Sequence, residues 1–374
     1  MRALEMDDPR IFPPPGAAPA WCARLFDLAG QSLGADISQR ADACDAAIGD
    51  AIDEMLRPSS GDALAVLFAS APSAAIYRHL WRILARRERA GAPEPSLVGC
   101  LVAIPVIVVA GAERAEAQGA MLSCVLDDPA RFASILRNGG ALAGNVTLAL
   151  PNTLAGAQAL AFARLPQLFA WRALAAPPEA LPPAPIAVAG SAEGVHLRFL
   201  VGTALAAAGA DLFRGQRVGS WGVPFSQAMS RALACPGVSV LALPRPPLPV
   251  VEAEWQGRLA QREVAAQIFA SNAIRKLRAS AGEPSAVISV HATEAGAEVR
   301  LSLSSPFDPR SAEGFRCALA PLDRVEDVVA MLETLMADFR VSDVRRMPGA
   351  HPDRDAATGL PLLFKAEAAP PALH

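Results

Sequence analysis

Five histidines are the side chains of this sequence best suited to acid–base chemistry or metal binding. They are His79, His196, His291, His351 and His374. Only the run from His351 to Asp355 has ligand-like spacing, because imidazole and carboxylate groups at alternate positions can meet one cation. Arg354 interrupts this run, and its neighbours are polar. We therefore interpret it as a solvated loop and predict no metal site and no cofactor.

A second set of polar side chains alternates with apolar residues in two strand-like segments. His196 and Arg198 lie in the first segment, and Glu298 and Arg300 lie in the second. Period-two alternation predicts strands with one buried face and one face in water. His196, Arg198 and Arg300 are therefore candidates for a ligand- or partner-binding surface, and an ordinary solvated sheet face is the alternative.

A glycine- and arginine-containing segment, residues 213–221, reads FRGQRVGSW. Arg214 and Arg217 make it a candidate anion-binding loop, because guanidinium and backbone N–H groups both suit phosphate. It matches neither the phosphate-binding loop of nucleoside triphosphatases nor the dinucleotide fingerprint, so a surface connection is the alternative. The basic turn at residues 271–278 lacks interleaved aromatic residues, and we predict no nucleic-acid binding.

The six cysteines and the short catalytic motifs give little support to an enzyme. No two cysteines are spaced as a CxxC pair, which argues against zinc and thioredoxin-like sites. No GxSxG, HExxH or Ser/Cys–His pairing appears with the local context that a catalytic motif needs. The first 16 residues are acidic and proline-rich, unlike a signal peptide. Reduced thiols in a cytoplasmic protein are the simplest interpretation.

The composition excludes several classes of protein. Hydrophobic residues make up 52% of the 374 residues and charged residues 19%, which does not fit a disordered chain. The net charge of -3 provides no basic field for nucleic acid. Only two of the 34 basic residues are lysines, Lys276 and Lys365, a bias that indicates a GC-rich, bacterial coding genome.

The most apolar run of the chain, residues 97–110, is too short to cross a membrane. It has 14 residues with Pro105 in its middle, whereas a spanning helix needs roughly 18 to 20. We therefore predict a buried strand and no membrane span.

Self-similarity indicates a degenerate internal repeat. The tetrapeptide LALP at residues 148–151 recurs at 241–244, and QLFA at 167–170 recurs as QIFA at 267–270. The matched pieces follow the order strand, helix, strand, strand, helix. We predict an α/β (α+β) fold of about three βαββα units, in ferredoxin-like order, after an N-terminal helix. An ordinary α/β chain with recurring phrases is the alternative.

The expected units divide the chain at the following residues. They are a Pro-rich arm (1–36), an N-terminal helix (37–62), repeat units one (63–145), two (146–237) and three (238–348), and a flexible tail (349–374). Unit one is expected to open with a strand at 63–69, and unit three to carry strands at 286–291 and 297–304. Helices are expected at about 73–90 and 129–138 in unit one and at 323–339 in unit three, where apolar residues recur at helical spacing. A last strand is expected at 341–347.

These features favour a non-catalytic, cytosolic protein-binding or assembly component of a bacterial multiprotein system. A protein partner is expected, and self-association into a homo-oligomer stays open. The alternative is an enzyme or small-ligand-binding protein with a pocket between repeat units, lined by His196, Arg198 and Arg300.

Overall fold

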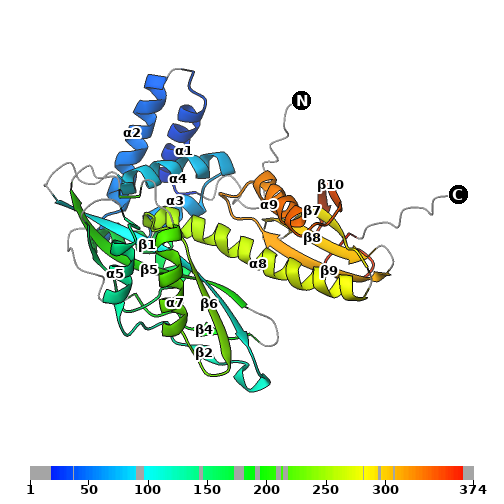
Figure 1. Ribbon diagram of the computed structural model, residues 1–374. Helices are drawn as coiled ribbons and strands as arrows, with labels where there is room; N and C mark the ends of the chain where they lie inside the picture. The colour runs from blue at the N-terminus through cyan, green and yellow to red at the C-terminus, as the bar shows by residue number, and fades with distance from the viewer. Residues whose placement is uncertain are drawn as a thin grey trace. The chain divides into compact units, whose positions relative to one another are not determined.

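The computed structural model shows a mixed α/β protein, with nine α-helices and ten strands in the described residues (Figure 1). These residues are 18–36, 38–89, 97–142, 146–171, 181–189, 194–207, 212–213, 218–280, 282–293, 296–305 and 308–364. They form two compact units. The N-terminal unit contains residues 18–71 and 79–261, and the C-terminal unit contains residues 72–78 and those from 262 onward.

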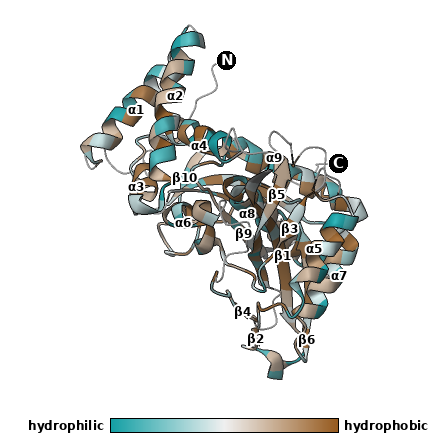
Figure 2. Ribbon diagram, turned by 90° about the vertical axis from the view of Figure 1, so that its left-hand side faces the viewer, coloured by the Kyte–Doolittle hydropathy of each residue, from teal (hydrophilic) through white to brown (hydrophobic). Residues whose placement is uncertain are grey.

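The N-terminal unit is built on an antiparallel sheet of order β3-β5-β1-β6. Its strands are β1 (Leu97–Ala112), β3 (Thr147–Ala149), β5 (Gly194–Ala207) and β6 (Val238–Pro244). The apolar run of the sequence is the long central strand β1, which is hydrophobic along most of its length (Figure 2). A strand that is apolar at successive positions must be covered on both faces, and Val106 and Ile107 are both fully buried.

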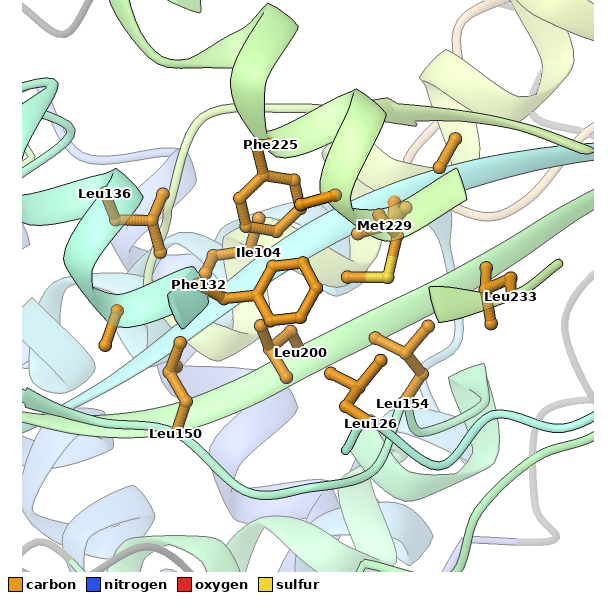
Figure 3. Packing of buried hydrophobic residues seen from close by; sticks show 14 of the residues in the cluster. Ile104, Leu126, Phe132, Leu136, Leu150, Leu154, Leu200, Phe225, Met229 and Leu233 are labelled. Carbon is orange, nitrogen blue, oxygen red and sulfur yellow. The ribbon is translucent and has the colours of Figure 1, made fainter. Parts of the chain in front are cut away.

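Two helices cover one face of this sheet, α5 (Pro129–Asn138) and α7 (Gly222–Ala232). Phe132 of α5 and Phe225 of α7 meet edge to face, with ring centroids 5.2 Å apart. Figure 3 shows both rings beside Ile104 of β1 and Leu200 of β5. Helices α5 and α7 are thus anchored by aromatic and aliphatic side chains in one continuous core.

Helix α8 (Val250–Ser280) begins in the N-terminal unit. Its Gly257 lies against β5, where an added Cβ would be 2.9 Å from Leu197 Cδ1 and 3.1 Å from Phe199 Cε1. The carboxylate of Glu88 accepts hydrogen bonds from the N–H groups of Val250 and Val251. A buried anion at this position satisfies free N–H groups and stabilises the helix dipole.

Helix α7 occupies the backbone groups of one residue, Ala242, at the free edge of β6. Ser226 of α7 donates to the carbonyl of Ala242 over 2.5 Å, and Ser230 accepts from the Ala242 N–H over 3.0 Å. These side chains occupy backbone groups that would otherwise be open to another strand.

The remaining elements of the N-terminal unit are mostly short helices. Helices α1 (Ala20–Leu33) and α2 (Ser38–Met55) lie side by side (Figure 1). The unit also contains α3 (Ala63–Ala69), α6 (Leu165–Ala170), most of α4 (Ala74–Arg89) and the paired strands β2 (Met121–Leu122) and β4 (Ile186–Ala187). The expected strand at 63–69 is wrong, because Leu64, Leu67 and Phe68 are buried at helical spacing.

The C-terminal unit contains a second sheet, of order β10-β7-β8-β9. Its strands are β7 (Ser285–Thr293), β8 (Gly296–Ser305), β9 (Asp308–Ala318) and β10 (Asp343–Pro352). The first three are antiparallel neighbours, and β10 pairs with β7 in parallel. Apolar residues of α8 and of α9 (Val325–Asp338) pack on one sheet face around Ile288, Val299 and Leu301.

The ferredoxin-like repeat is not confirmed. Strand β6, expected to open unit three, belongs to the first sheet, whereas β7 and β8 belong to the second. Strand β9 was not expected at all, and its pairing with β8 gives the second sheet a different order. The expected helices at 73–90, 129–138 and 323–339 are present as α4, α5 and α9.

No helix in the described part of the chain has both the length and the apolar character needed to span a membrane.

Candidate functional site

Polar side chains line one face of the C-terminal sheet, and they are buried. Ser289 and His291 lie on β7, and Glu298, Arg300 and Ser302 lie on β8. Arg300 is 0% exposed and Glu298 is 6% exposed. The expectation of a solvated face for Glu298 and Arg300 is therefore wrong. Buried charged groups need partners, so the contacts of this face define its chemistry.

Arg300 is the centre of the polar face. Its Nε donates to Glu298 Oε1 over 2.5 Å, and its Nη1 donates to the carbonyl oxygens of Asp353 over 2.6 Å and Leu362 over 3.0 Å. Its Nη2 donates to the Asp353 carboxylate. The neighbouring Arg316 of β9 donates from Nε to Glu298 Oε1 over 2.8 Å. The planar guanidinium thus bonds to carboxylates and to backbone carbonyls at once.

The segment that Arg300 holds is residues 353–364, which we name the C-terminal hairpin. Arg354 and Pro361 form an antiparallel bridge. The N–H of Leu362 donates to the Asp353 carbonyl over 3.0 Å, and the N–H of Asp355 donates to the Leu360 carbonyl over 2.9 Å. The segment was expected within a flexible tail from residue 349, but 349–352 belong to β10 and 353–364 pack on the sheet. Residues 365–374 lie outside the described part.

Two apolar side chains complete the docking of the C-terminal hairpin. Leu363 lies against Gly314 of β9, where an added Cβ would be 2.7 Å from both Leu363 methyl carbons. The Phe364 ring meets the His351 ring edge to face at a centroid distance of 4.7 Å. Gly314 therefore provides the space that Leu363 occupies.

His291 is held between two hydrogen bonds. Its Nδ1 lies 2.8 Å from the Pro352 carbonyl oxygen, and its Nε2 lies 2.8 Å from Ser289 Oγ. A carbonyl only accepts, which assigns the proton to Nδ1 and leaves Nε2 to accept from Ser289 in the neutral ring. Burial lowers the pKa of His291; the Pro352 carbonyl opposes this, while Arg300 and His351 add to it.

The two carboxylates bonded to Arg300 are held in their charged form. Burial raises the pKa of Glu298, but the hydrogen bonds from Arg316 and Arg300 outweigh it, and the pKa lies below its ordinary value. The hydrogen bond from Arg300 lowers the pKa of Asp353. Glu298, Asp353 and the two arginines therefore form a charge-balanced network.

Two residues of the His351–Asp355 run, His351 and Asp353, contact this polar face. His351 is the second-to-last residue of β10 and lies beside His291, with ring centroids 5.9 Å apart. Asp353 bonds to Arg300. The expectation of a solvated loop is therefore wrong for these residues. Across the described residues, no group of three histidine, cysteine, aspartate or glutamate side chains is arranged to hold a metal ion.

His196 and Arg198 lie in the N-terminal unit, at the start of β5. Arg198 donates from Nε to the Ala184 carbonyl over 2.6 Å and from Nη2 to the Pro185 carbonyl over 2.9 Å. It therefore holds the proline-rich segment before β4. Burial lowers the pKa of His196, and Arg198 adds to the effect. The contacts of Arg198 are those of a structural residue.

The expected site residues do not all lie in one unit of the protein. Arg300 lies in the C-terminal unit, whereas His196 and Arg198 lie in the N-terminal unit. Arg214 and Arg217 lie outside the described residues. Sequence reasoning missed Ser289, His291, Arg316 and Asp353 as members of one cluster. The alternation of Ser289 and His291 with Ile288 and Val290 was the available signal for the first two.

A cavity of about 280 Å³ lies in the N-terminal unit, among Leu56, Arg57, Arg87 and Phe169. Both guanidiniums bind carboxylates of α2. Arg57 donates to Glu54 over 3.0 Å, and Arg87 donates to Asp50 over 3.1 Å. Positive charge at this cavity is thus already balanced.

No protein-family model matches the sequence, and no curated protein or solved structure is significantly similar to it.

Proposed function

We propose that this chain is a non-catalytic protein-binding component of a bacterial cytosolic assembly, and that the polar face of its C-terminal sheet is a polypeptide-binding surface. The observation that carries the proposal is the bonding of the buried Arg300 to two backbone carbonyls of the C-terminal hairpin. Backbone carbonyls are present in every polypeptide and are seldom the main groups of a metabolite.

The surrounding contacts support the same chemistry. Asp353 offers its carboxylate to Arg300, and Leu363 fills the space beside Gly314. Main-chain hydrogen bonds provide affinity for a polypeptide, and side-chain contacts provide selectivity. The face therefore combines the two elements that peptide-recognition surfaces use.

A direct experiment is to isolate the tagged full-length chain from its own host and to examine it by native mass spectrometry. We expect a protein partner at fixed stoichiometry whose binding reduces amide exchange in β8 and β9. The Arg316→Ala variant should weaken this complex, whereas Arg345→Ala, which removes a similarly exposed arginine paired with Asp343, should not. A lone chain carrying a small-molecule adduct would overturn the proposal.

A second candidate function, an enzyme, is favoured by the pairing of Ser289 with His291. The ring accepts from the Ser289 hydroxyl at Nε2 and is oriented at Nδ1 by a carbonyl, which resembles the arrangement of a nucleophile and its general base. Ser289 is 1% exposed and His291 is 0% exposed, so a substrate reaches them only if the C-terminal hairpin moves.

A fluorophosphonate probe separates the two functions. The binding component is expected to stay unlabelled at Ser289 in the intact chain and in chains with a weakened hairpin contact. Labelling that disappears in Ser289→Ala and falls in His291→Gln would establish the enzyme and remove the non-catalytic assignment.

A further inference from the structure

We propose that the C-terminal hairpin is a replaceable internal ligand, and that the partner of the C-terminal sheet is an acidic polypeptide segment that takes its place. This inference rests on the proposed function. It specifies which chemistry the partner must present and how access to the surface is controlled.

The receiving surface requires one carboxylate from the segment that covers it. Arg300 and Arg316 carry two positive charges, and Glu298 carries one negative charge between them. His291 is neutral in its hydrogen-bonded form. One further carboxylate is needed for balance, and Asp353 supplies it. A segment that replaces the hairpin must therefore also bring an aspartate or glutamate to Arg300, because an uncompensated buried guanidinium is strongly unfavourable.

The receiving surface and the hairpin differ in their burial. Arg300, Ser289 and His291 are at most 1% exposed, whereas no residue from Pro352 to Phe364 is fully buried. Leu360 at the hairpin turn is 64% exposed. The side chains of the receiving surface are thus buried, while every residue of the hairpin keeps some contact with water. Elements with few buried apolar contacts open most readily.

The hairpin is also formed by its own hydrogen bonds. Asp355 accepts from the backbone N–H of Thr358 and from its hydroxyl, and the Gly359 N–H donates to the Asp355 carbonyl. Gly359 adopts a φ of 66°, which favours glycine at this turn. These bonds allow the hairpin to leave the sheet as a unit. A hairpin without packing is only marginally stable, so its N–H groups then exchange faster with solvent.

The test uses the full-length chain and a fluorescent synthetic peptide of residues 350–364. The Asp353→Ala chain keeps Arg300, Arg316 and Gly314 but has lost the carboxylate of its own hairpin. We expect it to bind the peptide at least about tenfold more tightly than the natural chain does, because the internal competitor is weakened. The same peptide carrying Asp353→Ala should bind at least about tenfold more weakly to this chain.

The matched control is the Asp343→Ala chain. It also loses a carboxylate of the C-terminal unit, but one that pairs with Arg345 and not with Arg300. It should bind the peptide as the natural chain does. If Asp353→Ala fails to fold, Phe364→Ala, which removes the ring beside His351, provides a second weakened chain.

Failure of either weakened, folded chain to bind the acidic peptide would overturn the inference, as would equal binding of the Asp353→Ala peptide. The proposed function is judged separately. A native partner that an excess of peptide does not displace would leave the protein-binding function standing and remove the replaceable hairpin. Peptide binding without any native partner would leave the replaceable hairpin standing and remove the protein-binding function.

Discussion

The two sheets of this protein show two ways of burying both faces of a β-sheet. In the N-terminal unit, β1 is apolar at successive positions, and its neighbours Val106 and Ile107 point to opposite faces and are fully buried. In the C-terminal unit, β8 alternates, and its apolar Leu301 and its charged Arg300 are also both fully buried. Alternation therefore predicts which residues share a face, but it does not predict that the polar face is in water.

The difference lies in what each buried face demands of its surroundings. An apolar face needs only close-packed neighbours and accepts any side chain that fills the space. A charged face needs specific donors and acceptors at fixed positions, since an unpaired charge is strongly unfavourable. The C-terminal sheet meets this demand with a particular chain segment, which is why we assign recognition to this sheet.

The largest expected effect is at the charged face. Arg300→Ala removes every bond between the guanidinium and Glu298, Asp353 and Leu362. We expect a loss of about 3–5 kcal/mol of unfolding free energy in the C-terminal unit, because one partner of a buried pair is left behind. Amide exchange of β7 and β8 measures this loss. Tryptophan fluorescence would not report on it, because all five tryptophans lie in the N-terminal unit. A loss below about 1 kcal/mol would mean that the ion pairs of Arg300 contribute no more than exposed surface pairs, contrary to the prediction.

The apolar sheet should respond to the loss of volume. Ile107→Ala leaves a cavity in the centre of β1 and should lower the unfolding free energy by about 3 kcal/mol. Urea unfolding monitored by tryptophan fluorescence measures this loss. Ile107→Val is the control, with an expected loss of about 1 kcal/mol. Equal losses for both variants would show that this position is not closely packed.

The stability of the C-terminal sheet should depend on pH through His291, Glu298 and Asp353. Because the folded pKa of His291 lies below its ordinary value of 6.5, the unfolded chain takes up the proton first, and stability falls as the pH drops below 6.5. Glu298 and Asp353 have lowered pKa values, so their contribution is present above their ordinary values of 4.5 and 3.8 and is lost as the pH falls through the folded values.

Amide exchange at pH 7 and pH 5.5 measures the histidine contribution separately from the carboxylates. We expect protection in β7 to fall over this range in the natural chain, and to fall less in His291→Gln. An equal fall in both chains would exclude His291 as the group that takes up the proton.

The smallest expected effect is at the rim of the charged face. Arg316 bonds to Glu298 but its side chain is 49% exposed. Arg316→Ala should therefore reduce the unfolding free energy by less than about 1 kcal/mol, measured by the same exchange experiment. A loss as large as that of Arg300→Ala would mean that both arginines act as buried charges.

The sequence predicted the elements whose pattern is local. Helix α9 and strands β7 and β8 follow from hydrophobic periodicity. The segment at 63–69 was assigned to the wrong element, since a short apolar run fits a strand or a buried helix. Strand β9 lacks regular alternation around Gly314 and Arg316, and it owes its structure to pairing with β8.

The candidate site could be predicted only in part. Arg300 was a candidate, but its partners Asp353 and Leu362 lie 53 and 62 positions further along the chain. No local pattern links these positions, because the contact depends on β10 returning parallel to β7. The same long-range packing turns an expected solvated face into a buried one.

The Asp353 carboxylate, through Arg300, holds the C-terminal hairpin on the charged sheet face. Amide hydrogen exchange in full-length Asp353→Ala tests it most directly, at the hydrogen-bonded N–H groups of Asp355, Gly359 and Leu362. We predict that residues 353–364 exchange faster than in the natural chain while β1 keeps its protection. Unchanged exchange in residues 353–364 of a folded Asp353→Ala chain would contradict the account.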